Sequence, residues 1–151
     1  MVQKTKWVLI VEDNDDIREA MMMLVEQYGY HPKSARNGKE ALSVLSECVN
    51  QPCLILLDWA MPTMSGKEFL EMQCAANIIV PIPVVVVSAA PPGKVPLGAM
   101  KILRKPFDIE NLLQDIDKYC GENLVEQIVA SAQIVGKEKF VATDYYPKEI
   151  A

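Results

Sequence analysis

The chain has no run of apolar residues long enough to cross a membrane. Its apolar segments are interrupted by polar residues or prolines, whereas a membrane-spanning helix needs about 20 consecutive apolar residues. The first residues lead directly into an apolar, strand-like segment and not into the core of a signal peptide. These absences predict a protein that does not contact membranes, and the cytoplasm is its expected location.

Basic residues, cysteines and histidines are also scarce. The 15 lysines and arginines stand against 20 aspartates and glutamates, so direct binding to nucleic acid is not expected. Four cysteines form no Cys-x-x-Cys pair and lie in segments typical of buried elements. They are predicted to be reduced packing residues without a disulfide or metal role: Cys48, Cys53, Cys74 and Cys120. His31, the only histidine, lies on a predicted edge strand.

The 151 residues have room for one domain and a short appendage. Short apolar segments, which are typical of buried strands, alternate with segments whose apolar residues recur at helical spacing. Strands are predicted at residues 7–11, 30–36, 53–57, 83–88 and 100–104, and helices at about 15–28, 39–49, 67–77 and 108–120. This alternation predicts an α/β protein with a doubly wound sheet.

The connection between the last two predicted strands is rich in proline. Residues 91–96 are Pro-Pro-Gly-Lys-Val-Pro, and proline removes a backbone donor and clashes with the preceding helical turn. We therefore expect this connection to form one helical turn at most.

Polar residues end four of the predicted strands. Glu12 and Asp13 follow the first strand, Asp58 the third, Ser88 ends the fourth, and Lys105 follows the fifth. Because the carboxyl ends of parallel strands meet at one edge of a sheet, these side chains are expected to converge. Clustered carboxylates repel one another and suit a Mg²⁺ ion. A carboxylate in such a site can attack a phosphoryl group, whose oxygens an ammonium and a hydroxyl would stabilise.

The order and spacing of these motifs resemble the receiver domain of two-component response regulators over about residues 6–120. The matching motifs are Val8-Leu9-Ile10-Val11-Glu12-Asp13-Asn14, Leu56-Leu57-Asp58-Trp59-Ala60-Met61-Pro62-Thr63-Met64-Ser65-Gly66, Val87-Ser88-Ala89, Gly98-Ala99 and Lys105-Pro106-Phe107. The resemblance implies a flavodoxin-like sheet of five parallel strands in the order 2-1-3-4-5. We assign residues 1–121 to a receiver domain, with a reduced fourth helix, and residues 122–151 to a C-terminal helix and tail.

The resemblance also implies how a metal ion would be held. Asp13 and Asp58 would bind Mg²⁺ directly, and Glu12 would act in the outer shell. The backbone carbonyl of Ala60 would complete the ligands that the protein supplies.

By the same resemblance Asp58 would accept a phosphoryl group from a sensor histidine kinase or a phosphotransfer protein. Ser88 and Lys105 would hold the phosphoryl oxygens. The domain would assist its own phosphorylation and dephosphorylation without being an enzyme in the usual sense. It would then relay the signal to a downstream protein through a changed surface, and a second copy of the chain is another candidate partner.

Two departures from the family pattern leave an alternative open. The family usually has a helix where residues 89–97 stand here, and an aromatic residue at the position of Ile102. Ile102 cannot signal by turning an aromatic ring. The alternative is a pseudo-receiver, which uses the same fold as an interaction module independent of phosphorylation.

Two other classes fit less well. A phosphatase of the haloacid-dehalogenase type needs a second aspartate two residues after its nucleophile, and Ala60 stands there. A flavodoxin needs a phosphate-binding loop after the first strand, and none is present. Residues 122–151 are either a linker or a helix and tail that cover the short connection or pair with a second chain.

Overall fold

The structure is a computed structural model that describes residues 6–75 and 82–121. In these residues strands and helices alternate along the chain, except that the last two strands follow one another without a helix, as the sequence predicts. Their bounds are β1 (Trp7–Val11), α1 (Asp15–Gln27), β2 (His31–Ala35), α2 (Gly38–Glu47), β3 (Leu54–Leu57), α3 (Gly66–Ala75), β4 (Val84–Ser88), β5 (Lys101–Arg104) and α4 (Ile109–Cys120).

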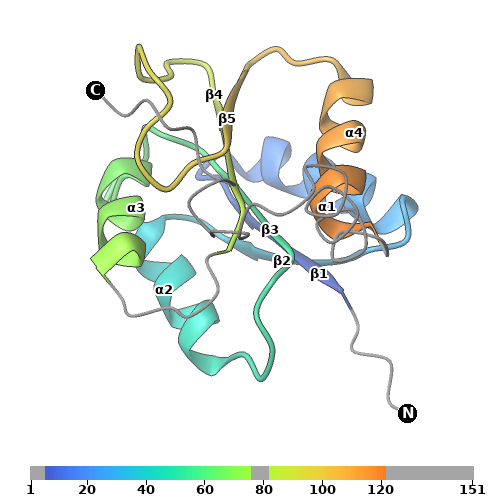
Figure 1. Cartoon of the computed structure of the whole chain (residues 1–151), viewed down its shortest axis with the longest axis horizontal. Helices are drawn as coiled ribbons and strands as arrows, with labels where there is room; N and C mark the ends of the chain where they lie inside the picture. The colour runs from blue at the N-terminus through green and yellow to red at the C-terminus, as the bar shows by residue number, and fades with distance from the viewer. Residues whose placement is uncertain (1–5, 76–81, 122–151) are drawn as a thin grey trace, which may run out of the picture.

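The strands form a single parallel sheet in the order β2-β1-β3-β4-β5. Helices α1 and α4 cover one face of this sheet, and α2 and α3 cover the other (Figure 1). The doubly wound, flavodoxin-like fold and its strand order are therefore confirmed.

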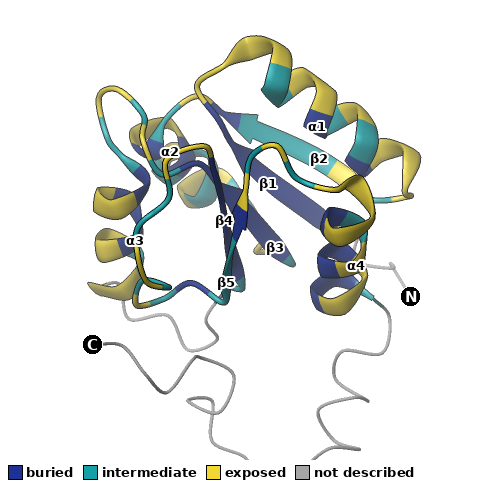
Figure 2. Cartoon of the chain, turned by 90° about the horizontal axis from the view of Figure 1, so that it is seen from above, coloured by how far each residue is buried: buried dark blue, intermediate teal, exposed yellow. Residues whose placement is uncertain are grey.

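The central strands consist almost entirely of apolar residues because they are buried on both faces. Every residue of β1, β3 and β4 is buried, as the dark blue strands of Figure 2 show. Along β1, Leu9 and Val11 pack toward α2 and α3, while Val8 and Ile10 pack toward α1 and α4. The outer strands β2 and β5 are only partly buried.

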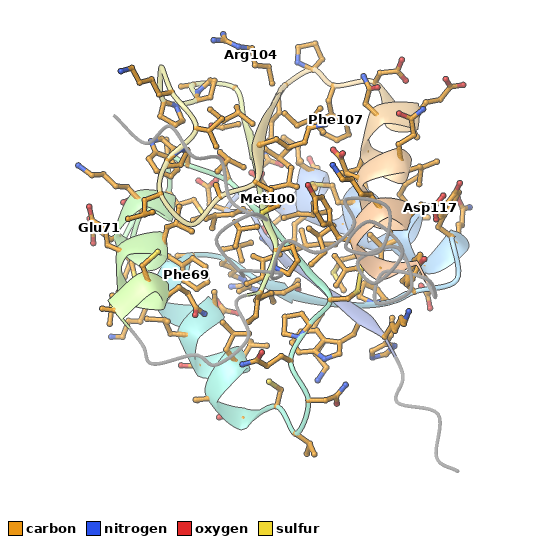
Figure 3. The ribbon with its side chains drawn as sticks, in the orientation of Figure 1. Phe69, Glu71, Met100, Arg104, Phe107 and Asp117 are labelled. Carbon is orange, nitrogen blue, oxygen red and sulfur yellow. A yellow bond between two sulfur atoms is a disulfide. The ribbon has the colours of Figure 1, made fainter. Side chains whose placement is uncertain are left out.

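Polar side chains cap the first turns of three helices. The side chains of Asn14, Asn37 and Asp108 accept hydrogen bonds from the first turns of α1, α2 and α4. On α3, the buried Phe69 belongs to the core, and Glu71 projects away from the molecule in Figure 3.

No helix forms in residues 89–100, the connection between β4 and β5. The predicted loss of the usual fourth helix is therefore confirmed, and the label α4 belongs to the helix that follows β5. Ala99, near the end of this connection, is buried, and its backbone N–H donates to the carbonyl of Pro96 at 3.1 Å.

The predicted reduced state of two cysteines is wrong. Cys53 and Cys120 form a disulfide across 67 positions of sequence, with Cα atoms 5.2 Å apart. The pairing arises because α4 packs on one face of the sheet and its last residue, Cys120, lies beside the residue that precedes β3, an arrangement that cysteine spacing does not reveal. Cys48 and Cys74 are free thiols. Cys74 is exposed, so its predicted burial is also wrong.

This arrangement predicts selective thiol reactivity. Without a reductant, an alkylating reagent should modify Cys74 and leave Cys53 and Cys120 unmodified. Partial desolvation raises the pKa of the Cys74 thiol, and only the thiolate reacts, so modification should accelerate as the pH rises. Peptide mass mapping before and after reduction measures this, and labelling of Cys53 in the unreduced protein would contradict it.

Within residues 6–75 and 82–121, no helix combines the length and apolar character needed to span a bilayer. The predicted helix and tail at residues 122–151 lie outside the described residues.

Candidate functional site

The candidate site lies at the carboxyl ends of the central strands. The backbone N–H of Glu12 donates to the carbonyl of Ala35 at 3.0 Å, and that of Asp58 donates to the carbonyl of Val11 at 2.9 Å. These bonds extend the sheet one step beyond β1 and β3. The first polar residue after each strand is thereby fixed by the sheet itself.

Three carboxylates meet there. Glu12, Asp13 and Asp58 each offer an oxygen within 4.8 Å of the others. Glu12 is 2% exposed and Asp58 7% exposed, whereas Asp13 is open to solvent. Carboxylate oxygens are hard ligands of the kind that Mg²⁺ prefers. Mg²⁺ also keeps several of its waters when bound, and the solvent-exposed side of the cluster at Asp13 leaves room for them.

Glu12 is held from two sides. One oxygen forms a salt bridge with the ammonium of Lys105, and the other accepts a hydrogen bond from the backbone N–H of Asn14 at 3.2 Å. Burial raises the pKa of Glu12; its hydrogen bond to Lys105 opposes this rise, and the charge of Asp58 adds to it. Three carboxylates lie beside the single ammonium of Lys105, so the net charge of the cluster is negative when all of them are ionised, which favours a bound cation.

The two oxygens of Asp58 have different surroundings. Oδ1 accepts a hydrogen bond from the backbone N–H of Trp59 at 2.7 Å. Oδ2 lies 3.7 Å from Nζ of Lys105, whose side chain is 13% exposed. Lys105 therefore contacts both buried carboxylates of the cluster.

Ser88 lies at the end of the neighbouring strand β4. Leu57 stands opposite Val86 in the register of β3 and β4, so Ser88 falls one residue beyond the level of Asp58. Its carbonyl accepts a hydrogen bond from the backbone N–H of Lys105 at 3.0 Å. Its hydroxyl oxygen accepts one from the backbone N–H of Ala90 at 3.3 Å.

The remaining predicted positions lie around this cluster. Ala60 is exposed at the start of the loop between β3 and α3. Ile102 is partly buried and packs against the core. His31 stands opposite Trp7, at the amino end of the sheet and away from the carboxylates.

Sequence reasoning missed one residue beside the site. Arg18 of α1 donates from its guanidinium to the backbone carbonyl of Glu12 at 2.9 Å. In the sequence it is one charged residue among several at the start of a helix, and no spacing rule separates it from an exposed arginine. Only the fold shows that this side chain turns back toward the end of β1.

Comparison with known proteins agrees with this geometry. The family model for the response regulator receiver domain matches residues 8–117. The phosphate regulon transcriptional regulatory protein PhoB of Klebsiella pneumoniae is 33% identical over 114 residues, which cover 72% of this chain and 49% of PhoB. The polar-differentiation response regulator DivK of Brucella anthropi is 33% identical over 122 residues, which cover 78% of this chain and 98% of DivK.

Solved structures show the same likeness. A response regulator receiver protein from Pseudomonas putida superposes with a TM-score of 0.70 at 24% identity, covering 78% of this chain and 99% of the other. The response regulator TrrA from Thermotoga maritima, solved in complex with Mg²⁺ and BeF, gives a TM-score of 0.64 at 27% identity, covering 76% of this chain and 98% of the other. The chain spans about half the length of the PhoB proteins it matches.

Proposed function

The chain belongs to the response regulator receiver domain family, and from this premise we propose that it accepts a phosphoryl group on Asp58. The donor would be the phosphohistidine of a sensor kinase or of a phosphotransfer protein. The observation that carries the proposal is the placement of Asp58 in a carboxylate cluster, with Lys105 at 3.7 Å from Oδ2.

In the proposed reaction a carboxylate oxygen of Asp58 attacks phosphorus. An oxygen–phosphorus bond forms, the nitrogen–phosphorus bond of the donor breaks, and the imidazole leaves with the electron pair. Lys105 would neutralise one phosphoryl oxygen as a compact ammonium. Ser88 accepts a hydrogen bond through an oxygen lone pair, and its hydroxyl proton can still be donated to a second phosphoryl oxygen.

The residues present fit a Mg²⁺ site. We assign Asp13, Asp58 and the backbone carbonyl of Ala60 as its direct ligands and Glu12 as an outer-shell residue. The outer-shell role of Glu12 is supported by its existing bonds to Lys105 and to the backbone of Asn14. A bound Mg²⁺ supplies neutralisation of the negative charge that collects on the phosphoryl oxygens.

The output of this receiver is also part of the proposal. Phosphorylation would change an interaction surface that a downstream protein binds, with a second copy of the chain as a further candidate, and the protein would act in the cytoplasm. It would promote its own phosphorylation and dephosphorylation and turn over no separate substrate. The aliphatic Ile102 and the helix-free connection after β4 indicate a readout that differs from an aromatic rotation.

The pseudo-receiver alternative predicts a site that no longer binds the ion or the phosphoryl group. The buried cluster of Glu12 and Asp58, with Lys105 paired to it, argues against such a loss.

Trp59 offers a direct test, because its backbone N–H binds Asp58. Mg²⁺ followed by beryllofluoride, which mimics an aspartyl phosphate, should change the tryptophan fluorescence of the chain, to which Trp59 and Trp7 both contribute, in a saturable way. In Asp13→Asn the Mg²⁺ concentration that gives half of the response should rise at least about tenfold, because a charged ligand is lost. Asp16→Asn, which removes a nearby exposed carboxylate outside the cluster, is the matched control and should respond like the wild type. A wild-type protein that responds to neither reagent would favour the pseudo-receiver.

A further inference from the structure

Arg18 is a largely buried arginine behind the carboxylate cluster. Its side chain is 12% exposed, and charged residues are rarely buried to this extent unless they are paired. One guanidinium nitrogen donates to the backbone carbonyl of Glu12 at 2.9 Å. Another forms a salt bridge with the exposed carboxylate of Asp15, one turn earlier on the same helix. The guanidinium thus links the first turn of α1 to the end of β1.

The start of α1 holds the other end of the same short segment. The backbone N–H of Arg18 donates to the carbonyl of Asn14 at 2.9 Å, the first backbone hydrogen bond of the helix, and Asn14 caps α1 by accepting from the N–H of Ile17 at 3.0 Å. Residues 12–14 are therefore fixed at one end by the guanidinium of Arg18 and at the other end by the start of the helix. Asp13, the exposed member of the cluster, lies at the middle of this segment.

We propose that Arg18 is a positioning residue for Mg²⁺: it holds the backbone of residues 12–14 so that Asp13 and Glu12 face Asp58. The inference rests on the proposed function, because it concerns the ion that this site would bind. Arg18 contacts neither the ion nor the phosphoryl group in this scheme. It acts through the carbonyl of Glu12, as the outer partners of metal ligands do when they fix ligand orientation.

The charge of Arg18 and its positioning role predict opposite changes. A positive guanidinium repels a second cation, so removing it for electrostatic reasons alone would tighten Mg²⁺ binding. If the guanidinium orders the ligands, removing it weakens binding instead. The direction of the change therefore separates the two effects.

The experiment is a titration of the full chain with Mg²⁺ alone, in which calorimetry and tryptophan fluorescence each measure the affinity. Thermal melting of each variant checks that it is folded. Arg18→Met should bind Mg²⁺ about tenfold more weakly than the wild type. Arg18→Lys keeps the positive charge but lacks the planar guanidinium, whose separate nitrogens donate to the Glu12 carbonyl and to Asp15 at the same time. This variant should therefore also bind Mg²⁺ more weakly than the wild type. Arg36→Met is the control: it removes an exposed positive charge that also acts on Asp15, and its affinity should be unchanged or slightly higher.

Each outcome decides a different point. If the wild type does not bind Mg²⁺, the proposed function fails. If the wild type binds and Arg18→Met binds equally or more tightly, the positioning role is overturned while the proposed function stands. If Arg18→Met does not fold, Arg18→Lys decides the question, and wild-type affinity in that variant overturns the role.

Discussion

Asp58→Asn will not become phosphorylated by a small donor such as acetyl phosphate in the presence of Mg²⁺. Asparagine has nearly the shape of aspartate, and its side-chain oxygen can still accept the bond from the backbone N–H of Trp59. An amide oxygen, however, is a poor nucleophile and carries no negative charge for a metal ion. The expected effect is complete loss of the phosphorylated species, read by intact mass.

Folding should survive this substitution. Lys105 keeps its salt bridge to the buried Glu12, so no ammonium is left without a partner in the site. Asp16→Asn makes the same chemical change outside the cluster and should be phosphorylated like the wild type. If folded Asp58→Asn still gains a phosphoryl group, the acceptor is a different residue and the assignment is wrong.

Gly66→Ala will lose about 3 kcal/mol of folding stability, because the site leaves no room for a side chain there. A Cβ at Gly66 would lie 2.3 Å from the carbonyl oxygen of Asp58 and 2.9 Å from Cα of Trp59. Both are backbone atoms that cannot swing aside like the end of a flexible side chain. The N–H of Gly66 also donates to the carbonyl of Trp59 at 2.9 Å, so the start of α3 cannot move away without losing this bond.

Urea denaturation of Gly66→Ala and Gly93→Ala makes the comparison. A Cβ at Gly93 would meet no atom within 4 Å, so this variant should match the wild type within about 0.5 kcal/mol. Equal stability of the two variants would show that the loop after Asp58 yields more easily than its packing implies.

The sheet could be predicted because burial on both faces leaves a plain signal in the sequence. The runs around Leu56 and Val86 have no polar alternation, as parallel strands covered by helices require. The short connection before β5 was equally predictable, since its prolines exclude a regular helix. The polar residues that follow these strands were then expected to meet at one edge of the sheet, because the carboxyl ends of parallel strands lie together there. These residues include Glu12, Asp58 and Lys105.

Other features depend on contacts that no local pattern encodes. The disulfide between Cys53 and Cys120 depends on where α4 ends relative to the start of β3. The bond from Arg18 to the Glu12 carbonyl requires the angle at which α1 leaves β1. The pairing of Lys105 with Glu12 as well as with Asp58 depends on the directions of the three side chains within the cluster.

We propose that Glu12, Asp13, Asp58 and Lys105 form one Mg²⁺-dependent phosphoacceptor site. The most direct test is to incubate the wild-type chain with acetyl phosphate and Mg²⁺, and to map the modified residue by peptide mass spectrometry after reductive trapping of the acyl phosphate. We predict one phosphoryl group per chain, located on Asp58 and absent when Mg²⁺ is chelated. A phosphoryl group on another residue, equal labelling without Mg²⁺, or no labelling at all would contradict it.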